Sequence, residues 1–340
     1  MDHRTQLLAL INANWTTQVV RAACELDIPG HLGQNDRSLE QLASATGCHA
    51  PSLLRLVRAL ATLGLCVETQ AGRFALAPMG RLLCEDDPQS LRAWALLVGG
   101  PHWARWGELH ESVRTGRSFK QRHLEEEGFG DLDADPAAAA LFHRAMVQMT
   151  RRTAVAIAGA IPIGKAACVV DLGGGQGELL ATVLQTHPSA RGILFDLPTG
   201  VVGAQDSLGR SGVMDRCRIE SGDFFCTVPQ GGDIYLLKSV LHNWDDERAV
   251  RILTNCRDAM RPGGVIIVVE RVMSRQPGDS PADRVVLRSD LNMLVALTGR
   301  ERTLVEFDAL FAKAGLGPTK LLAAGGDFSL IVAGVMDASP

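Results

Sequence analysis

The sequence predicts an α/β protein whose second half is a doubly wound parallel sheet and whose first half is helical with a winged-helix pattern. From about residue 166, short apolar runs alternate with helical patterns. This alternation of apolar strands and helices is typical of a parallel sheet covered by helices on both faces. Before that point, apolar residues recur at spacings of three and four, the period of amphipathic helices. We therefore divide the chain into residues 1–100, 101–165 and 166–340.

The winged-helix prediction comes from residues 1–100. Apolar spacing predicts a long helix over 3–26. Ser38, with Gln41 three positions later, has the spacing of a capping box and should begin the next helix. A second helix is expected over 50–65, and the segment 66–78 suits a small hairpin. Helix, turn, helix and hairpin in this order is the winged-helix pattern.

The middle segment, residues 101–165, should be helical with interruptions. It contains Trp103, Trp106 and the alanine-rich run 136–149. The polar stretch 123–136 is the part that we expect to form an exposed loop.

The sheet prediction depends on apolar runs that are stopped by glycine or acidic residues. A hairpin over 320–335 should close the sheet. In an open sheet of this kind, ligands bind beyond the carboxyl ends of the strands. The predicted parallel strands are 167–173, 192–198, 216–225, 233–242 and 263–272.

Composition excludes several classes of function. The net charge of −4 gives no overall attraction to nucleic acid or to an anionic membrane. The first thirty residues carry charges and lack an apolar signal core, and no apolar run is long enough to span a bilayer. The eight cysteines form no CxxC pair, which favours scattered buried thiols and predicts no metal site. We expect a cytoplasmic protein.

A glycine-rich motif follows the first predicted strand. DLGGGQG, residues 171–177, places Asp171, Gly173 and Gly175 between a strand and a helix. Glycines there let the backbone turn sharply and approach a ligand. A plain strand-to-helix turn would also use them. A dinucleotide fingerprint is disfavoured, because its third glycine would fall on Glu178, an acid that would repel a pyrophosphate.

Acidic residues also end the next two predicted strands. Asp196, followed by Leu197, could accept both ribose hydroxyls of a nucleoside. Gly222, Asp223 and Phe224 could bind and cover an adenine base. Each residue alone could be an ordinary loop or core residue. Acids or glycines at three successive strand ends form a more specific pattern, which indicates a nucleoside ligand.

His242 and Trp244 lie just beyond the fourth predicted strand, within LLKSVLHNWDDE. A lone histidine is more often structural than functional. This one, however, is placed where a nucleoside ligand would present its reactive end.

With these motifs the sequence resembles the S-adenosylmethionine-dependent small-molecule O-methyltransferases, the family that includes caffeic acid O-methyltransferase and polyketide-tailoring methyltransferases. The resemblance covers nearly the whole chain, and its motifs occur in the expected order. They are NANWTTQVVRAACELDIPGHL (12–32), FHRAM (142–146), DLGGGQG (171–177), FDLP (195–198), GDFF (222–225), LKSVLHNWDDE (237–247), VVERV (268–272), DLNML (290–294) and GRERT (299–303).

The resemblance implies a seven-stranded methyltransferase sheet, an N-terminal domain that forms a homodimer, and S-adenosyl-L-methionine as cofactor. It places the general base on His242 and two supporting acids on Glu270 and Glu301. Asn243 departs from the Asp that many members have after the base. The implied cofactor residues are Asp171, Gly173, Gly175, Asp196, Leu197, Gly222, Asp223, Phe224 and Lys238, with Met146 and Thr150 at the sulfonium end.

The implied reaction favours an aromatic acceptor. The acceptor hydroxyl must lose its proton, and a phenol, with a pKa of about 10, ionises far more readily than an aliphatic alcohol. We therefore expect a small hydroxylated aromatic substrate in an apolar pocket. Its candidate residues could also be ordinary core residues. They are Trp103, Trp106, Phe142, Met146, Met149, Trp244, Asn292 and Met293.

Two other functions fit parts of the pattern. A transcription regulator would use the winged helix, but Arg55 and Arg58 on its second helix do not form a basic run. In the resembled family this module forms the dimer instead. A protein of this fold could also methylate nitrogen or carry out other chemistry. His242 argues for proton abstraction from an acceptor.

Overall fold

The computed structural model describes residues 2–125, 127–164 and 167–335, and the chain forms two compact units. The first unit consists of Met1–Ala104 and Ala140–Met149, and the second of Arg105–Ala139 and Thr150–Pro340. One long helix, α11 (Pro136–Ala160), contributes residues to both units. The segment boundaries at residues 100 and 165 stay predictions.

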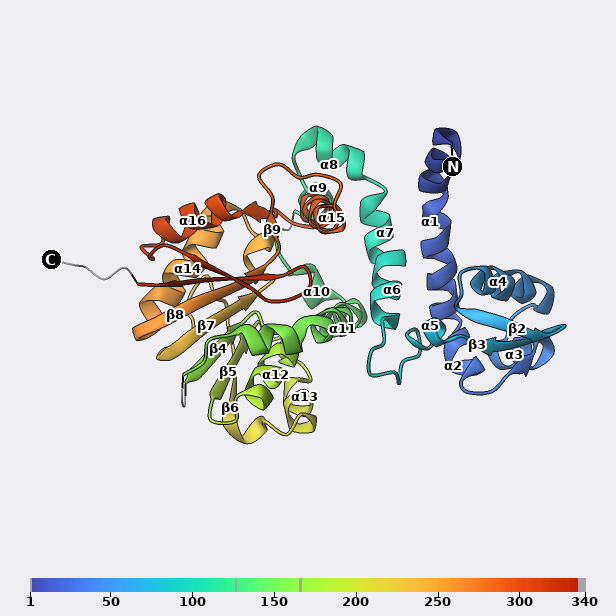
Figure 1. Ribbon diagram of the computed structural model, residues 1–340, viewed down its shortest axis with the longest axis horizontal. Helices are drawn as coiled ribbons and strands as arrows, with labels where there is room; N and C mark the ends of the chain where they lie inside the picture. Colours follow the sequence, from blue (N-terminus) through green and yellow to red (C-terminus); the bar gives the residue numbers. More distant parts are fainter. Residues whose placement is uncertain (1, 126, 165–166, 336–340) are drawn as a thin grey trace. The chain divides into compact units, whose positions relative to one another are not determined.

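The first unit contains the predicted helix, turn, helix and hairpin (Figure 1). Ser38 and Gln41 form the expected capping box at the start of α3, and Gly72 turns the hairpin with φ of 73°. Its sheet has the strand order β1-β3-β2. Its elements are α1 (His3–Glu25), α2 (Ile28–Leu32), β1 (Arg37–Ser38), α3 (Leu39–Thr46), α4 (Ala50–Thr62), β2 (Cys66–Gln70), β3 (Arg73–Leu76), α5 (Pro78–Arg81) and α6 (Arg92–Gly99); α7 (Pro101–Trp106) begins in it.

One side of α1 is apolar and exposed within the single chain. Trp15 is 65% exposed and Leu10 is 74% exposed. Leu7, Leu8 and Ile11 are exposed as well. An apolar surface of this kind on one helix commonly marks a contact with another protein.

The second unit is built on a seven-stranded sheet with the order β11-β12-β8-β7-β4-β5-β6. Every neighbouring pair from β8 to β6 is parallel, whereas β12 is antiparallel to both of its neighbours. The predicted doubly wound sheet and its closing hairpin are thus confirmed. The strands are β4 (Cys168–Leu172), β5 (Arg191–Asp196), β6 (Cys217–Ser221), β7 (Gly232–Lys238), β8 (Met260–Glu270), β11 (Lys320–Ala323) and β12 (Ser329–Gly334).

Helices cover both faces of this sheet, which is why its strands are apolar without interruption. Alternate strand residues pack against α14 (Asp246–Ala259) and α16 (Leu304–Lys313) on one face. On the other face they pack against α12 (Glu178–Thr186), α13 (Ala204–Arg210) and the last turns of α11. The strand order reverses between β4 and β7, so the crevice at their carboxyl ends is the expected ligand site.

Most of the described residues in the stretch 123–136 are exposed, as predicted, but Asp131 is not. Lys120 is 2% exposed, and its ammonium group bonds Asp131 Oδ1 at 2.5 Å. Arg105 bonds the other oxygen of Asp131 at 3.0 Å. A buried lysine needs a charged partner, and this need draws the acidic segment inward. The prediction of an exposed loop is therefore wrong for Asp131, whose side chain is 14% exposed.

Within the described ranges, no helix combines the length and apolar character that crossing a bilayer requires.

Short helices, one longer helix and a two-stranded parallel pair complete the second unit. The elements are α8 (Leu109–Thr115), α9 (Phe119–His123), α10 (Asp131–Ala134), the short helices η1 (Met214–Arg216) and η2 (Leu241–Asn243), the parallel pair β9 (Val272–Met273) and β10 (Arg302–Thr303), and α15 (Pro281–Ala296).

Candidate active site

The glycine motif forms the turn between β4 and α12. Gly173, Gly175 and Gly177 all have positive φ, at 68°, 57° and 80°. A side chain at Gly173 would come within 2.9 Å of Val240, whereas one at Gly175 would meet nothing within 4 Å. The turn therefore requires glycine for its conformation, and its backbone is open to a ligand at Gly175.

Asp196 links this turn to the end of β5. Its Oδ2 accepts a hydrogen bond from the Gly175 amide at 2.7 Å, and its Oδ1 accepts one from the Leu197 amide at 2.7 Å. The two bonds fix the carboxylate beside the open face of the turn. An ionised carboxylate offers about four acceptor positions, so its chemistry suits ribose hydroxyls.

The buried Asp171 and the partly buried Lys238 lie at the reversal point of the sheet. Burial and the negative charge of Asp196 raise the pKa of Asp171 to about 7. Burial lowers the pKa of Lys238 to about 8. One Asp171 oxygen, Oδ2, has no hydrogen-bond partner among the described residues. A polar ligand with its own donors would satisfy this atom, so the crevice fits the nucleoside and amino-acid parts of S-adenosylmethionine.

The third strand end brings Phe224 close to the glycine turn. A Cβ placed on Gly173 would lie 3.9 Å from the Phe224 ring. Asp223 caps its own loop by accepting from the Phe225 amide at 2.8 Å. A side chain at Gly222 would come within 2.8 Å of Phe195. The residues predicted at all three strand ends therefore lie together at one edge of the sheet, where ligands of such sheets bind.

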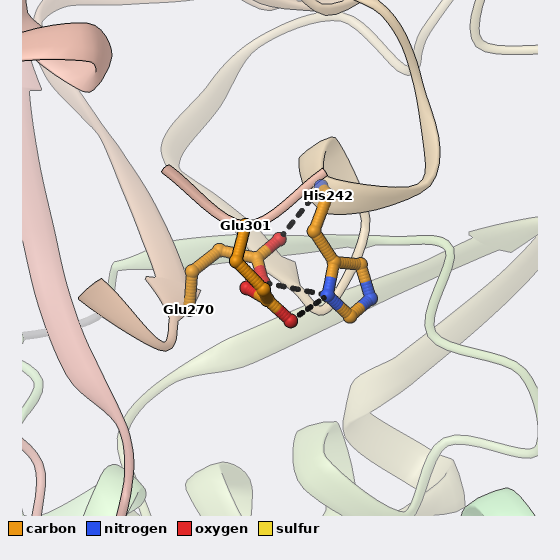
Figure 2. A group of neighbouring side chains, drawn as sticks. All are labelled: His242, Glu270 and Glu301. Carbon is orange, nitrogen blue, oxygen red and sulfur yellow. Dashed lines mark hydrogen bonds and ion pairs between the residues drawn. The ribbon is translucent and has the colours of Figure 1, made fainter. Parts of the chain in front are cut away.

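His242, Glu270 and Glu301 form a compact buried cluster (Figure 2). The His242 ring nitrogen Nδ1 lies 3.0 Å from Glu301 Oε1 and 3.4 Å from Glu270 Oε2. The backbone amide of His242 also donates to Glu270 Oε1 at 3.3 Å. Three segments that are distant in the sequence, namely η2, the end of β8 and the residue before β10, are thus brought together, as the resemblance implied.

The electrostatics of this cluster favour a charged imidazole. Burial alone would lower the pKa of His242, but Glu270 and then Glu301 outweigh burial and raise it above its ordinary value. Burial raises the pKa of Glu270. Burial also opposes ionisation of Glu301, yet the hydrogen bond from His242 offsets this and lowers its pKa. Glu301 is therefore the ionised partner of the ring.

This arrangement sets the tautomer of the neutral ring. Because Nδ1 faces two carboxylates, it carries the proton and donates it to Glu301. The other nitrogen, Nε2, then keeps its lone pair and can accept a proton from a ligand. Such a ring, oriented by an acid, can act as a general base.

The cluster also has the residue types of a metal site. Its candidate ligand atoms lie within 4.8 Å of one another. The hydrogen bonds that His242 makes with Glu301, at 3.0 Å, and with Glu270, at 3.3 Å, hold the three residues at this spacing without an ion.

Two polar side chains near the cluster were not predicted from the sequence. Ser289 on α15 donates to Glu301 Oε1 at 2.5 Å, and Asp290 accepts from the Glu301 amide at 2.9 Å. Asn243, the departure from the family pattern, donates from Nδ2 to the Ser239 carbonyl at 3.0 Å. Asn243 therefore ties its own turn together.

Four predicted acceptor contacts lie in the second unit, and they form a connected group. Trp106 donates to Asn292 Oδ1 at 2.9 Å. Met293 packs against Phe129, whose ring lies 6.2 Å from that of Trp244. Phe129 was missed because it is a single aromatic residue within a polar stretch. Trp244 is only 7% exposed and also packs against Phe225, so it is in part a core residue.

The other predicted contacts belong to the first unit. Phe142 and Met146 pack against α6. Trp103 is 39% exposed, and Met149 is the last residue of α11 in that unit. Thr150, which follows, belongs to the second unit. Their roles as acceptor or cofactor contacts stay predictions.

Comparison with known proteins identifies the family. The O-methyltransferase domain matches residues 106–317, and the O-methyltransferase dimerisation domain matches residues 8–86. The first match covers more than half of the chain and contains every strand-end residue described above. The second covers the winged-helix segment.

Several characterised relatives align with almost the whole chain. The phenazine O-methyltransferase PhzM of Lysobacter antibioticus is 37% identical, over 96% of this chain and 95% of its own length. The O-demethylpuromycin-O-methyltransferase of Streptomyces alboniger is 37% identical, over 96% and 88%. An 8-amino-8-demethylriboflavin N,N-dimethyltransferase of Streptomyces davaonensis is 35% identical, over 92% and 90%.

Solved structures agree with these matches. The crystal structure of LaPhzM superposes with a TM-score of 0.94 and 35% identity, over 99% of this chain and all of the other. NcsB1 from neocarzinostatin biosynthesis was solved with S-adenosylmethionine and 2-hydroxy-5-methyl naphthoic acid. It superposes with a TM-score of 0.79 and 31% identity, over 94% and 96%. The chain therefore belongs to the O-methyltransferase family and is an S-adenosylmethionine-dependent O-methyltransferase.

Proposed function

We propose that this enzyme methylates a phenolic hydroxyl of a small aromatic natural product and that His242 is the general base. The observation that supports this proposal is the buried His242–Glu301 pair, which leaves Nε2 as the acceptor of a proton. Glu270 holds the backbone of the same turn. A nitrogen acceptor that is already an uncharged nucleophile would not need such a base.

The reaction is an in-line displacement of the methyl group from a sulfonium by an oxygen. The methyl donor is already activated, so the protein mainly aligns the partners and removes a proton. A phenol has a pKa of about 10 and an ordinary histidine about 6.5, so full transfer across ~3.5 units would cost roughly 5 kcal/mol. The raised pKa of His242 narrows this gap. The nearby sulfonium charge would further favour the phenolate.

The crevice supplies the cofactor contacts in this proposal. Asp196 accepts from the ribose hydroxyls, and Asp223 and Phe224 bind and cover the adenine. Lys238 and the buried Asp171 face the amino-acid part, where their opposite charges match its carboxylate and ammonium groups. Gly173, Gly175, Leu197 and Gly222 provide backbone surface, and Thr150 of the same unit is the candidate for the sulfonium end.

The acceptor class rests on the relatives and on the residues near His242. Similar proteins are named for methylating phenazine, puromycin and mitomycin intermediates. We propose that Trp106, Asn292, Met293 and Trp244, all in the second unit, contact the acceptor. Aromatic and methionine side chains suit a flat apolar substrate, since methionine adapts to varied shapes.

Methyl transfer to a matched panel of acceptors tests this proposal. With labelled S-adenosylmethionine, we expect transfer to hydroxylated naphthoates, phenazines or hydroxybenzoates. We expect no transfer to the corresponding methyl ethers, in which the hydroxyl is blocked, or to benzylic alcohols, which ionise far less readily. Preferred transfer to the amino analogue of each phenol would contradict an oxygen acceptor.

The exposed face of α1 supports a homodimer through residues 1–100. Trp15→Glu should convert a dimer into monomers at micromolar concentration, because it places a charge in an apolar interface. Light scattering measures the mass directly. Val155→Glu, on a valine of the second unit that is 75% exposed, is the matched control and should remain dimeric. A wild-type protein that is monomeric at this concentration would refute the homodimer.

A DNA-binding role for the winged helix makes a different prediction. Arg58 on α4 pairs with Glu68 of the hairpin at 3.5 Å, and this pairing reduces the charge available to a phosphate backbone. We expect no sequence-specific DNA shift.

A further inference from the structure

Arg302 is a fully buried arginine that contacts the turn carrying His242. It is 0% exposed. Its Nη1 donates to the Leu241 carbonyl at 3.0 Å, and its Nη2 donates to the Trp244 carbonyl at 2.8 Å. These two carbonyls lie on either side of His242. The guanidinium therefore holds both ends of the short helix η2.

The charge of Arg302 is balanced by Asp246 at the start of α14. Arg302 Nε and Nη2 bond Asp246 Oδ1 at 3.0 and 2.8 Å. Burying a guanidinium is costly unless it is paired and hydrogen-bonded. Four hydrogen bonds with good geometry meet that requirement. A lysine in this position has one ammonium group and cannot reach two carbonyls and a carboxylate in the same planar arrangement.

The backbone of Arg302 joins the segments that carry both acids. It follows Glu301 directly, and β10 pairs in parallel with β9, where Arg302 lies opposite Val272. Val272 is two residues beyond Glu270. Gly299 of the same loop also lies against the His242 turn, because a Cβ there would overlap the His242 carbonyl. Arg302 thus contacts the segments that carry His242 and Glu270 and directly follows Glu301 in the chain.

We propose that Arg302 is a positioning residue, which fixes the distance between His242 and its two carboxylates by holding η2 against the Gly299–Thr303 loop. This inference rests on the proposed role of His242 as the base. Without the guanidinium bonds, the turn would shift relative to Glu301. A displacement of about 1 Å in a catalytic arrangement can cost on the order of a hundredfold in rate.

Arg302→Lys tests the inference in the full-length enzyme. The lysine keeps a positive charge near Asp246, but it lacks the two guanidinium nitrogens that donate to the Leu241 and Trp244 carbonyls. We expect kcat to fall by about ten- to a hundredfold, while the Kd for S-adenosylhomocysteine changes less than about twofold, because the cofactor crevice is formed by other strand ends. The midpoint of the kcat pH profile should move toward the ordinary histidine value, since His242 loses contact with Glu301.

Arg300→Lys is the matched control. Arg300 lies on the same loop, is 45% exposed, and pairs with Asp246 and Glu306. In the described part of the chain it makes no hydrogen bond to the turn that carries His242, so its substitution should leave kcat and the pH profile unchanged. If Arg302→Lys fails to fold, as judged by circular dichroism, Asp246→Asn replaces it. That change removes the counter-charge that holds the buried Arg302 guanidinium in place, from a side chain that is itself 43% exposed.

A double-mutant cycle with His242→Ala separates this inference from the proposed function. If Arg302 acts through His242, adding Arg302→Lys to the His242→Ala enzyme should lower kcat no further. An equal loss in both backgrounds would overturn the positioning role and leave the base assignment intact. A folded Arg302→Lys, or Asp246→Asn in its place, with wild-type kcat and pH profile would also overturn the positioning role. Normal turnover by His242→Ala alone would instead contradict the proposed function.

Discussion

His242→Ala should lower the turnover of a phenolic acceptor by about 10²–10⁴-fold, the usual contribution of general-base catalysis. The ring accepts the hydroxyl proton at Nε2 while Glu301 holds Nδ1, and alanine removes both interactions. The affinity for S-adenosylmethionine should stay nearly unchanged, because the imidazole is not expected to touch the nucleoside. Steady-state kinetics and calorimetry measure the two quantities separately.

Two further variants make this result specific. His242→Gln keeps a polar side chain but removes the basic nitrogen, so its activity should be close to that of His242→Ala. His110→Ala removes a histidine that is 73% exposed in the same unit and should behave as wild type. Should His242→Ala lose cofactor binding, His242 would be a structural residue of the crevice. Normal turnover would mean that alignment of the two substrates suffices.

The wild-type pH profile should rise through the pKa of His242. The base works only when its ring is neutral, and the two carboxylates raise its pKa above the ordinary value of about 6.5. Activity should therefore increase as the pH passes this raised pKa and then level off. In His242→Ala this rise of activity with pH should disappear, and only the pH dependence due to ionisation of the acceptor itself should remain. If the same rise persisted in the variant, it would report the ionisation of a group other than His242.

Asp196→Ala should weaken S-adenosylmethionine binding by about ten- to 150-fold, equivalent to ~1.5–3 kcal/mol for hydrogen bonds to a charged group. The ribose hydroxyls lose their acceptor. The Gly175 amide also loses the bond that fixes the glycine turn. Calorimetry with S-adenosylmethionine measures the change.

Asp215→Ala is the control for this prediction. Asp215 is an exposed acid on η1 in the same unit, and its substitution should leave binding unchanged. Asp196→Asn keeps one acceptor oxygen and should lie between alanine and wild type. Unaltered affinity in Asp196→Ala, or comparable binding of NAD by the wild type, would count decisively against the cofactor assignment.

The sheet and the strand-end residues could be predicted because their signals are local. Each buried strand is a continuous apolar run, and the glycine turn needs its positive φ whatever surrounds it. Asp196 and Asp223 stand where such runs stop, so the fold alone places them at one edge. The capping box of Ser38 and Gln41 is equally local.

The contacts made by loops could not be predicted in the same way. Ser289 and Arg302 act through partners that are 12 to 61 positions away, and Phe129 packs against residues of another element, α15. No periodicity distinguishes Arg302 from Arg300, although one is fully buried and the other is 45% exposed. The burial of Arg302 follows from the carbonyls of η2, which exist only once the sheet has formed. The acidic segment near Asp131 was misjudged for a related reason, since its buried partner Lys120 lies on α9.

Single-turnover methyl transfer to phenols of graded acidity tests the central claim most directly. The acceptors should share one ring skeleton and differ in a remote substituent, and the rates should be compared between wild type and His242→Ala at saturating S-adenosylmethionine. If His242 removes the proton, the variant should lose most activity with weakly acidic phenols and regain much of it with phenols that are already ionised. Losses that are equal across the series would show that His242 does not act as the base.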